Sequence, residues 1–346
     1  MKIIIRIFIK VLKCAVWALA FYIVVLFGMW LWCAQPVLIQ PDQSPHHFNP
    51  SPDHLKQYVK NISEGYSPRS FTNTANLERL AVYIKNEFEK TANGVSIQNF
   101  SVTMPDYVRY PEKKENYINI SALYGPETKE RIVIGAHYDA FHTYPGADDN
   151  ASGVAGLLEL GQMLKTKKDL PIQVELAAYA LEEPPFFETD QMGSAIHAKK
   201  LREKNINVRL MIVLEMIGYF SEQESSQNFP TFLMGLYYPT KGNFISVVGD
   251  LKNRSNVLKM KKAILSTGGI DVYSISAPAA LPGIDFSDHR NYWIYEYPAV
   301  MITDTAFYRN PHYHTYKDTF EKLDYEKMAE VLKGVMTSIY QIGKVE

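Results

Sequence analysis

The stretch RIVIGAHYDAFHTYPGADDNASG, residues 131–153, decides the fold class of this chain. It opens with a short apolar run and continues through a polar loop rich in His, Asp and Gly. It then leads into the run at 152–165, which we expect to be helical. A strand followed by a loop and a helix is the unit from which parallel sheets covered by helices are built. The stretch therefore predicts an α/β domain.

Strands and helices alternate on both sides of this stretch. Strand-like apolar runs lie at 95–102, 116–124, 131–136, 172–181, 209–216 and 298–303. Helices are expected at 73–90, 152–165, 194–204 and 325–340, and in the first of them the apolar residues recur at helical spacing. Strands that alternate with helices pair largely in parallel through right-handed crossovers. We therefore expect a mostly parallel, mixed sheet sandwiched between helices in three layers.

An uninterrupted apolar run, CAVWALAFYIVVLFGMWLWC, occupies residues 14–33. As a helix it would span roughly 30 Å, the thickness of the hydrocarbon core of a bilayer. Signal peptides have shorter apolar cores that end in small residues, whereas this run ends in Trp30 and Trp32. We therefore expect an uncleaved transmembrane anchor. Cations alone precede it, which predicts a cytoplasmic N-terminus and an outer location for residues from about 36 onward. These cations are Lys2, Arg6, Lys10 and Lys13.

These features divide the chain into a basic cytoplasmic stub at 1–13, the anchor at 14–33, a tether at 34–55 and a folded domain at 56–346. The tether is expected because that segment holds five prolines. The charge balance of 36 basic and 37 acidic residues is not that of a highly basic nucleic-acid binder. The two cysteines, Cys14 and Cys33, bound the anchor, so a metal site in the outer domain must use His and carboxylates.

Residues that commonly bind metals follow four of the predicted strands. In sheets of this kind, ligands bind beyond the carboxyl ends of the strands. Each residue alone is weak evidence for a metal site; an acidic pair, for example, is also common at the start of a helix. Together, at one edge of the sheet, these residues predict one site. Two His and three carboxylates would leave a charge of +1 on two divalent cations, and this mixed set suits zinc. The residues are His137, Asp139, Asp148, Asp149, Glu182, Glu183, Glu215 and His314.

In order and spacing, these motifs resemble the co-catalytic di-zinc aminopeptidases of metallopeptidase family 28, over roughly residues 75–340. The resemblance rests on His137-x-Asp139, the GADDNASG loop at 146–153, Glu182-Glu183, Glu215, the SDH tripeptide at 287–289 and HTxxDT at 314–319. It implies that His137 and Glu215 bind one zinc ion and that Glu183 and His314 bind a second. Asp149 would bridge the two ions, and Asp148 would bind neither.

The resemblance also implies roles for residues that bind no metal. Asp139 would accept a hydrogen bond from the His137 ring and fix its tautomer. Glu182 would be the general base and Glu183 the ligand. Neighbouring side chains of an extended segment point to opposite sides, so one of the pair can face the metal while the other faces the water. Tyr313 would donate a hydrogen bond to the oxyanion, or else serve only as a packing aromatic. Asp288 and His289 are expected behind the ligands or facing the substrate.

One segment departs from the family pattern, and another is expected to border the site. Residues 184–192, PPFFETDQM, separate the Glu-Glu pair from Gly193-Ser194, and their prolines and phenylalanines could form an apolar wall of the pocket. Residues 219–238, rich in Phe and Tyr, are expected at the pocket rim. His197 lies on a predicted helix and is expected to be structural.

The expected activity is removal of N-terminal residues from peptides outside the cytoplasm. A carboxypeptidase of the same family would bind a free carboxylate, for which Arg254 or Arg290 could serve. A glutaminyl cyclase would use one zinc ion for an intramolecular attack. A receptor-like domain would have lost ligands, yet all five ligands and the base are present. The complete bridging set favours two metals and hydrolysis.

Overall fold

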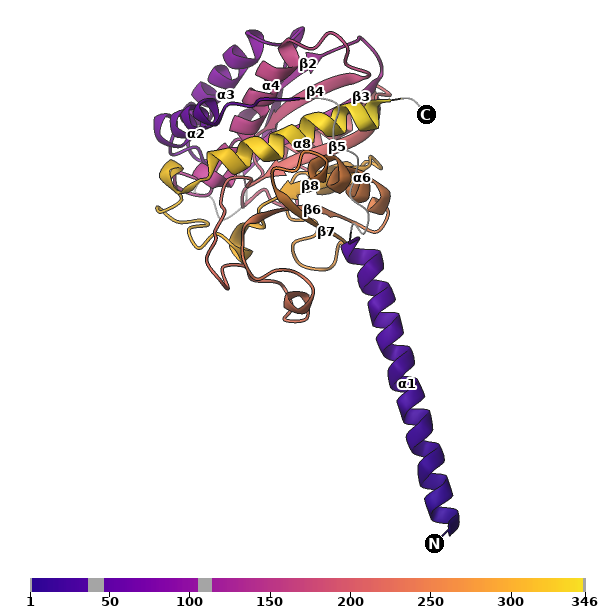
Figure 1. Ribbon diagram of the computed structural model, residues 1–346. Helices are drawn as coiled ribbons and strands as arrows, with labels where there is room; N and C mark the ends of the chain where they lie inside the picture. The colour runs from indigo at the N-terminus through magenta and orange to yellow at the C-terminus, as the bar shows by residue number, and fades with distance from the viewer. Residues whose placement is uncertain (1, 37–46, 105–113, 345–346) are drawn as a thin grey trace.

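The computed structural model describes residues 2–36, 47–104 and 114–344, and its centre is one eight-stranded sheet (Figure 1). The strand order is β1-β2-β4-β3-β5-β8-β6-β7. Parallel pairs join β3 to β4 and β5, β5 to β8, and β6 to β7, whereas the other neighbours are antiparallel. The strands are β1 (Gly94–Thr103), β2 (Lys114–Tyr124), β3 (Glu130–His137), β4 (Gln173–Tyr179), β5 (Asn207–Glu215), β6 (Phe244–Gly249), β7 (Asp271–Ser276) and β8 (Ala299–Thr303).

Helices cover both faces of the sheet, which confirms the expected three-layer α/β class. Successive residues of β3 show why: Ile132 and Ile134 belong to one buried cluster and Val133 to the other. Figure 1 shows α8 lying across the first face between α4 and α6, and α5 and α7 pack on the second. The helices are α1 (Lys2–Ala34), α2 (Pro52–Gly65), α3 (Thr74–Glu89), α4 (Gly153–Lys165), α5 (Gly193–Glu203), α6 (Arg254–Leu265), α7 (His289–Ile294) and α8 (Tyr325–Gly343).

The predicted strands and helices all form, but two regions differ from the expectation. Helix α2 begins at Pro52, inside the expected tether, and Ser51 caps it by accepting a hydrogen bond from the His54 amide. Proline suits the first turn of a helix, so the proline-rich composition concealed a helix start. Residues 52–55 of the expected tether are therefore helical, and its residues 37–46 lie outside the described ranges.

The second difference is the segment from β6 to α7, in which the sequence predicted no element. Both of its strands are only six residues long, and such short apolar runs give a weak periodicity signal.

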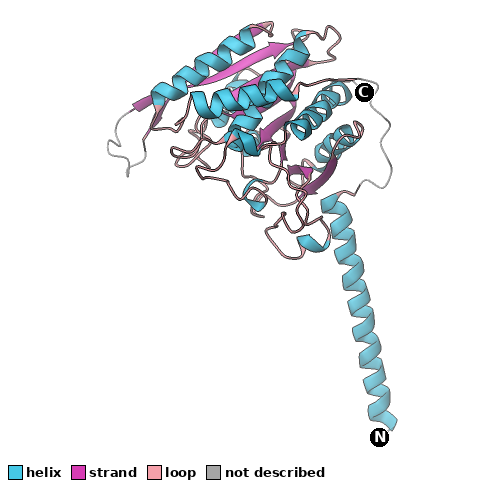
Figure 2. Ribbon diagram, turned by 60° about the vertical axis from the view of Figure 1, so that its left-hand side comes forward, coloured by secondary structure: helices cyan, strands magenta, loops and turns pink. Residues whose placement is uncertain are grey.

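Helix α1 extends away from the domain in both ribbon views (Figures 1 and 2). It contains the expected anchor at 14–33 and begins further upstream, at Lys2. Within Ile3–Ala34, an 18-residue window has a mean hydropathy of 2.2, and none of that window is buried. By length and composition the helix could span a membrane or be a signal sequence. The division of the chain into stub, anchor, tether and domain stays a prediction.

Candidate metal centre

Two groups of potential metal ligands lie side by side and share one residue. His137, Asp149 and Glu215 form the first group, and Asp149, Glu183 and His314 form the second. Asp149 Oδ1 is 3.4 Å from His137 Nε2, and Asp149 Oδ2 is 3.1 Å from His314 Nε2. On the outer sides, Glu215 Oε2 is 3.4 Å from His137 Nε2 and Glu183 Oε2 is 3.3 Å from His314 Nε2. Asp149 thus offers one oxygen to each group, as a bridging ligand would.

The parallel strands bring these residues together. His137 is the last residue of β3 and Glu215 the last of β5, whereas Glu183 and His314 lie in the loops after β4 and β8. Asp149 lies in the segment η1 (Ala147–Ser152) between β3 and α4, where its own backbone is not helical, with φ -102° and ψ 95°. Because these strands run in the same direction, their carboxyl ends meet at one edge of the sheet.

The loop that carries Asp149 is held from several sides. The guanidinium of Arg69, which is fully buried, donates hydrogen bonds to the carbonyls of Tyr138, Pro145, Gly146 and Asp149. Asp318 accepts hydrogen bonds from the amides of Asp148 and Asp149 at 3.0 and 3.2 Å. Gly146 has φ 56°, and a Cβ there would lie 2.1 Å from the Asp149 carbonyl oxygen. The loop therefore requires glycine at this position.

Asp139 and Asp148 support the site without joining either group. Asp139 Oδ1 lies 3.5 Å from His137 Nδ1, and the two Asp139 oxygens accept hydrogen bonds from the amides of Glu182 and Glu183. Asp139 therefore also positions the Glu-Glu pair, a contact that the sequence did not indicate. Asp148 accepts hydrogen bonds from the Gly218 amide and from Asn310 Nδ2, so its carboxylate is engaged away from the ligands.

The centre is built to hold positive charge. Burial alone would raise the pKa of Asp149, but the two His rings hold it below its usual range. Burial raises the pKa of Glu183 to about 7, and the Asp149 carboxylate acts in the same direction. Burial lowers the pKa of His314, yet its contacts with Asp149 and Glu183 raise it to about 10.

The donor atoms fit a metal. Nε2 of His137, Nε2 of His314 and Oε1 of Glu183 are buried and find no hydrogen-bond partner among the residues that the structure describes. A polar atom buried in this way costs free energy unless something binds it. Two imidazoles and three carboxylates, with no thiolate, form a donor set that suits zinc.

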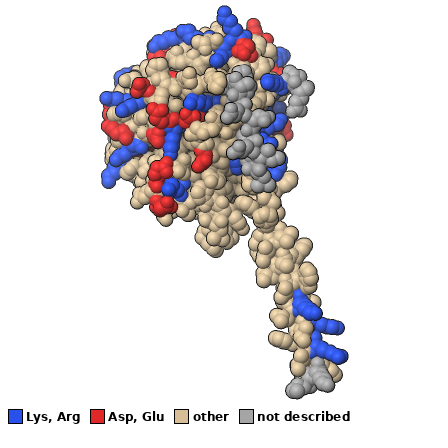
Figure 3. Space-filling model, viewed as in Figure 1, with Lys and Arg blue, Asp and Glu red and all other residues tan. Residues whose placement is uncertain are grey.

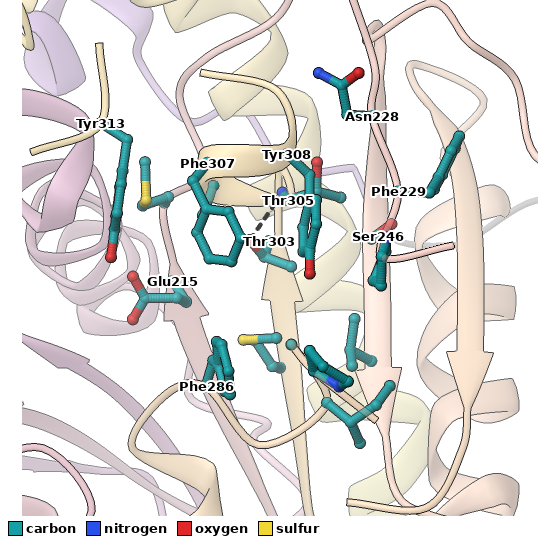
Figure 4. A pocket seen from close by; sticks show the side chains of 18 of the residues that line it. Glu215, Asn228, Phe229, Ser246, Phe286, Thr303, Thr305, Phe307, Tyr308 and Tyr313 are labelled. Carbon is teal, nitrogen blue, oxygen red and sulfur yellow. Dashed lines mark hydrogen bonds between the residues drawn. The ribbon is translucent and has the colours of Figure 1, made fainter. Parts of the chain in front are cut away.

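Aromatic rings fix the orientation of His314. Its ring stacks on Tyr313, with centroids 3.8 Å apart, and on Phe141 at 4.2 Å. The hydroxyl of Tyr313 and the carboxylate of Glu215 face the same space in Figure 4. Burial and the nearby Asp149 carboxylate raise the pKa of Tyr313, which therefore stays a hydrogen-bond donor at neutral pH. Phe141 was not predicted, and no spacing rule would have found it.

A cavity of about 280 Å³ opens beside the two ligand groups. Four acidic residues of the centre line one end, and the rest of the wall is largely apolar (Figure 4). Pro184 and Phe187 line it as expected, whereas Phe186 is buried in the core against Phe71 and Tyr117. The expected rim, 219–238, contributes wall residues between Gln227 and Tyr238.

The remaining candidates do not face the cavity. Asp288 and His289 are fully buried and do not line the cavity, and His289 Nε2 donates to the Ile284 carbonyl. Neither faces the substrate; Asp288 lies behind the ligands, close enough to His137 and Glu215 to interact with their charges. His197 contacts Tyr292 and Glu175 and is structural, as expected. Arg254 Nε donates to the Trp32 carbonyl beside α1, and Arg290 pairs with Glu188 and Asp285. Neither arginine therefore reaches the cavity, and the described residues that line it include no Lys or Arg to bind a free carboxylate.

Comparisons with known proteins agree with this arrangement. The sequence profile of peptidase family M28 matches residues 119–339. The uncharacterized protein YfbL of Escherichia coli (strain K12) is 46% identical over 315 residues, which cover 88% of this chain and 92% of that protein. Leucine aminopeptidase 1 of Ajellomyces capsulatus (strain H88) is 24% identical over 276 residues, covering 76% of this chain and 64% of the relative. A Zn-dependent exopeptidase from Parabacteroides distasonis ATCC 8503 shares the fold, with a TM-score of 0.64 at 22% identity, over 85% and 99% of the two chains.

The matched region begins in β2 and ends in α8, so it contains both ligand groups and the loops that carry them. It also contains the apolar cavity beside them. The chain belongs to peptidase family M28 and is a metallo-exopeptidase of this zinc-dependent family.

Proposed function

We propose that the protein is a di-zinc aminopeptidase, anchored in a membrane by α1, that removes N-terminal residues from peptides outside the cytoplasm. The observation that carries the proposal is the position of Asp149. One of its oxygens faces His137 in the first ligand group, and the other faces His314 in the second. A carboxylate shared in this way suits two ions rather than one. His137 and Glu215 would hold one zinc ion, Glu183 and His314 the other, and Asp149 both.

The chemistry follows from the residues around the ligands. When bound, zinc polarises the peptide carbonyl and lowers the pKa of water toward neutrality. Glu182 takes a proton from the attacking water while the water oxygen bonds to the carbonyl carbon. It then delivers that proton to the amine as the carbon–nitrogen bond breaks. Tyr313 donates a hydrogen bond to the oxygen on which negative charge develops. Burial raises the pKa of Glu182 well above its usual range, which suits a group that accepts and returns a proton.

The cavity favours a free N-terminus over a free C-terminus. Glu182 lines it without belonging to either ligand group, and the described lining residues include no Lys or Arg. A C-terminal carboxylate would therefore find no basic side chain to pair with along the described wall, whereas an ammonium group could pair with the Glu182 carboxylate. The apolar remainder of the wall suits a hydrophobic side chain at the cleaved bond. The complete bridging set also supports hydrolysis over a one-zinc cyclisation.

The proposed location of the catalytic domain is inferred from the charged residues that precede the apolar part of α1. The apolar part of α1 is preceded by four cations and no acid, and such segments keep their basic end in the cytoplasm. The catalytic domain, which follows the helix, would then lie outside.

A panel of peptides tests the proposed activity. The detergent-solubilised full chain is incubated with peptides whose N-terminus is free or acetylated, with and without a chelator, and one peptide begins with Gln. We expect cleavage of free N-termini only, loss of activity with chelator and recovery on adding zinc. Equal cleavage of acetylated peptides would favour a carboxypeptidase, and cyclisation of the Gln peptide without hydrolysis would favour a cyclase. Either result would overturn the proposal.

A further inference from the structure

An exposed apolar loop borders the cavity. We call residues 229–238, FPTFLMGLYY, the tip loop; it contains no charged residue. Phe232 is 84% exposed and Leu236 is 71% exposed, and Leu233 and Tyr237 are also exposed. Soluble surfaces expose single large apolar side chains, but a cluster of this kind marks a contact with another apolar surface.

The tip loop lies beside the end of α1. The Tyr237 ring stacks on Trp30 with centroids 5.5 Å apart, and both ribbon views place the loop next to the top of the helix (Figures 1 and 2). In Figure 3 the lower surface of the domain next to α1 bears no Lys, Arg, Asp or Glu. Trp30 belongs to the apolar run 14–33, so a side chain at its level lies at the membrane boundary if that run crosses the bilayer.

The domain is clamped directly to the end of the helix. Arg254 Nε donates to the Trp32 carbonyl at 2.9 Å, and its guanidinium lies 4.0 Å from the Trp32 ring centroid. Ser274 Oγ donates to the Ala34 carbonyl and Lys261 Nζ to the Gln35 carbonyl, both at 2.9 Å. These contacts fix the direction in which the tip loop faces relative to the helix axis. The loop therefore faces the same bilayer that the helix would cross.

We propose that the tip loop inserts into the interfacial layer of the membrane that α1 spans. Aromatic and aliphatic side chains without charges are those that bury in this layer, to a depth of about 5–10 Å. Tyr and Trp prefer the level of the headgroups, which is where Tyr237 and Trp30 meet. The inference rests on the membrane anchor of the proposed function and not on its peptidase chemistry.

The docked loop would also shape the cavity. Phe229, Pro230, Met234 and Tyr238 belong to the tip loop and line the cavity wall, whereas Phe232 and Leu236 do not. One segment therefore faces the membrane with some residues and the substrate with others. Membrane contact would hold that wall in place, and the cavity would lie close to the bilayer surface.

Fluorescence quenching in proteoliposomes tests the insertion. The full chain, with Cys14→Ser and Cys33→Ser, carries a fluorophore at Phe232→Cys, and the vesicles contain lipids with a quencher on the upper acyl chain. The control carries the fluorophore at Val82→Cys, because Val82 is an exposed apolar residue, 49% exposed, on α3, and this helix lies far from α1 in Figure 1. We expect about threefold stronger quenching at 232 than at 82, since an inserted side chain reaches the depth of the quencher.

Equal quenching at the two positions would overturn the proposal. A label at Leu233→Cys should likewise be quenched, and Phe232→Ser with Leu236→Ser should abolish that quenching while α1 stays inserted. If burial of the label at 232 increases with protein concentration but not with the amount of lipid, the tip loop contacts a second copy of the chain. That result would also overturn the proposed insertion. Hydrolysis of a soluble leucyl peptide, measured on the same vesicles, separates the two proposals. Quenching without hydrolysis contradicts only the proposed function, and hydrolysis without quenching contradicts only the insertion.

Discussion

Glu182 and Glu183 are adjacent in sequence, yet they lie against different ligand groups. Glu182 Oε2 is 3.9 Å from His137 Nε2, whereas Glu183 Oε2 is 3.3 Å from His314 Nε2. Asp139 accepts hydrogen bonds from both amides and so sets the direction of each side chain. One residue can therefore bind metal while its neighbour moves protons.

Replacing Glu182 separates these two roles. Glu182→Gln keeps the size of the side chain but cannot accept a proton, so turnover should fall by about 10²- to 10⁴-fold. The zinc content, measured by elemental analysis, should not change, because Glu182 belongs to neither ligand group. Glu188→Gln is the matched control, since Glu188 is half-exposed and pairs with Arg290 at 3.3 Å. An unchanged rate in Glu182→Gln would refute the assigned base.

Arg69 is the residue on which the bridging loop depends. Arg69→Met would leave four buried carbonyl oxygens without their donor, which should lower the free energy of unfolding by about 3 kcal/mol. Zinc affinity should fall as well, because the Asp149 loop would lose its support. The control is Arg79→Met on α3, because the exposed Arg79 guanidinium donates to Asn76 Oδ1 and lies over the Tyr66 ring, and neither contact touches the Asp149 loop. Chemical denaturation and zinc titration of both variants measure the effect, and equal behaviour would contradict this role.

The ligand residues could be predicted because each follows a recognisable apolar strand, and the ends of parallel strands meet at one edge. Arg69 and Phe141 could not be predicted, because their importance lies in contacts made only after folding. Arg69 reaches the loop from 69 to 80 residues away in sequence. Phe141 supports His314 through ring stacking, which leaves no periodic pattern.

At the scale of elements, the sequence indicated the central strands more clearly than the edge of the sheet. Strands β3 and β5 are buried on both faces and read as continuous apolar runs. Strand β7 alternates between buried and more exposed residues over only six positions, and α2 starts in a proline-rich stretch that also suits a tether. Short or ambiguous runs of this kind gain their structure from tertiary packing rather than from local preference.

Helices α6 and α8 pack so closely that one glycine is required between them. A Cβ at Gly334 would lie 2.6 Å from Ile264 Cγ1 and 2.7 Å from Ile264 Cα. Gly334→Ala should therefore destabilise the fold by about 1–3 kcal/mol through overpacking, although alanine favours helix by about 1 kcal/mol. Gly65→Ala in α2 meets no atom within 4 Å and should not destabilise. Thermal or chemical unfolding distinguishes the two, and a stabilised Gly334→Ala would contradict the packing.

At the scale of the whole molecule, the charges before α1 predict which side of the membrane holds the domain. In a chain with Cys14→Ser and Cys33→Ser, a membrane-impermeant thiol reagent should label Val82→Cys in intact spheroplasts. It should label Ile9→Cys only after lysis, because residues 1–13 would lie in the cytoplasm. Labelling in the reverse order would place the domain inside the cell.

The fold of the whole domain brings His137 and His314, which are 177 positions apart in the sequence, to the two sides of Asp149. Anomalous X-ray scattering on crystals of the full chain grown with zinc tests this most directly. The account predicts two zinc peaks about 3.5–4 Å apart, one against His137 and Glu215 and the other against Glu183 and His314, with Asp149 between them. A single peak, or no peak beside Asp149, would contradict it.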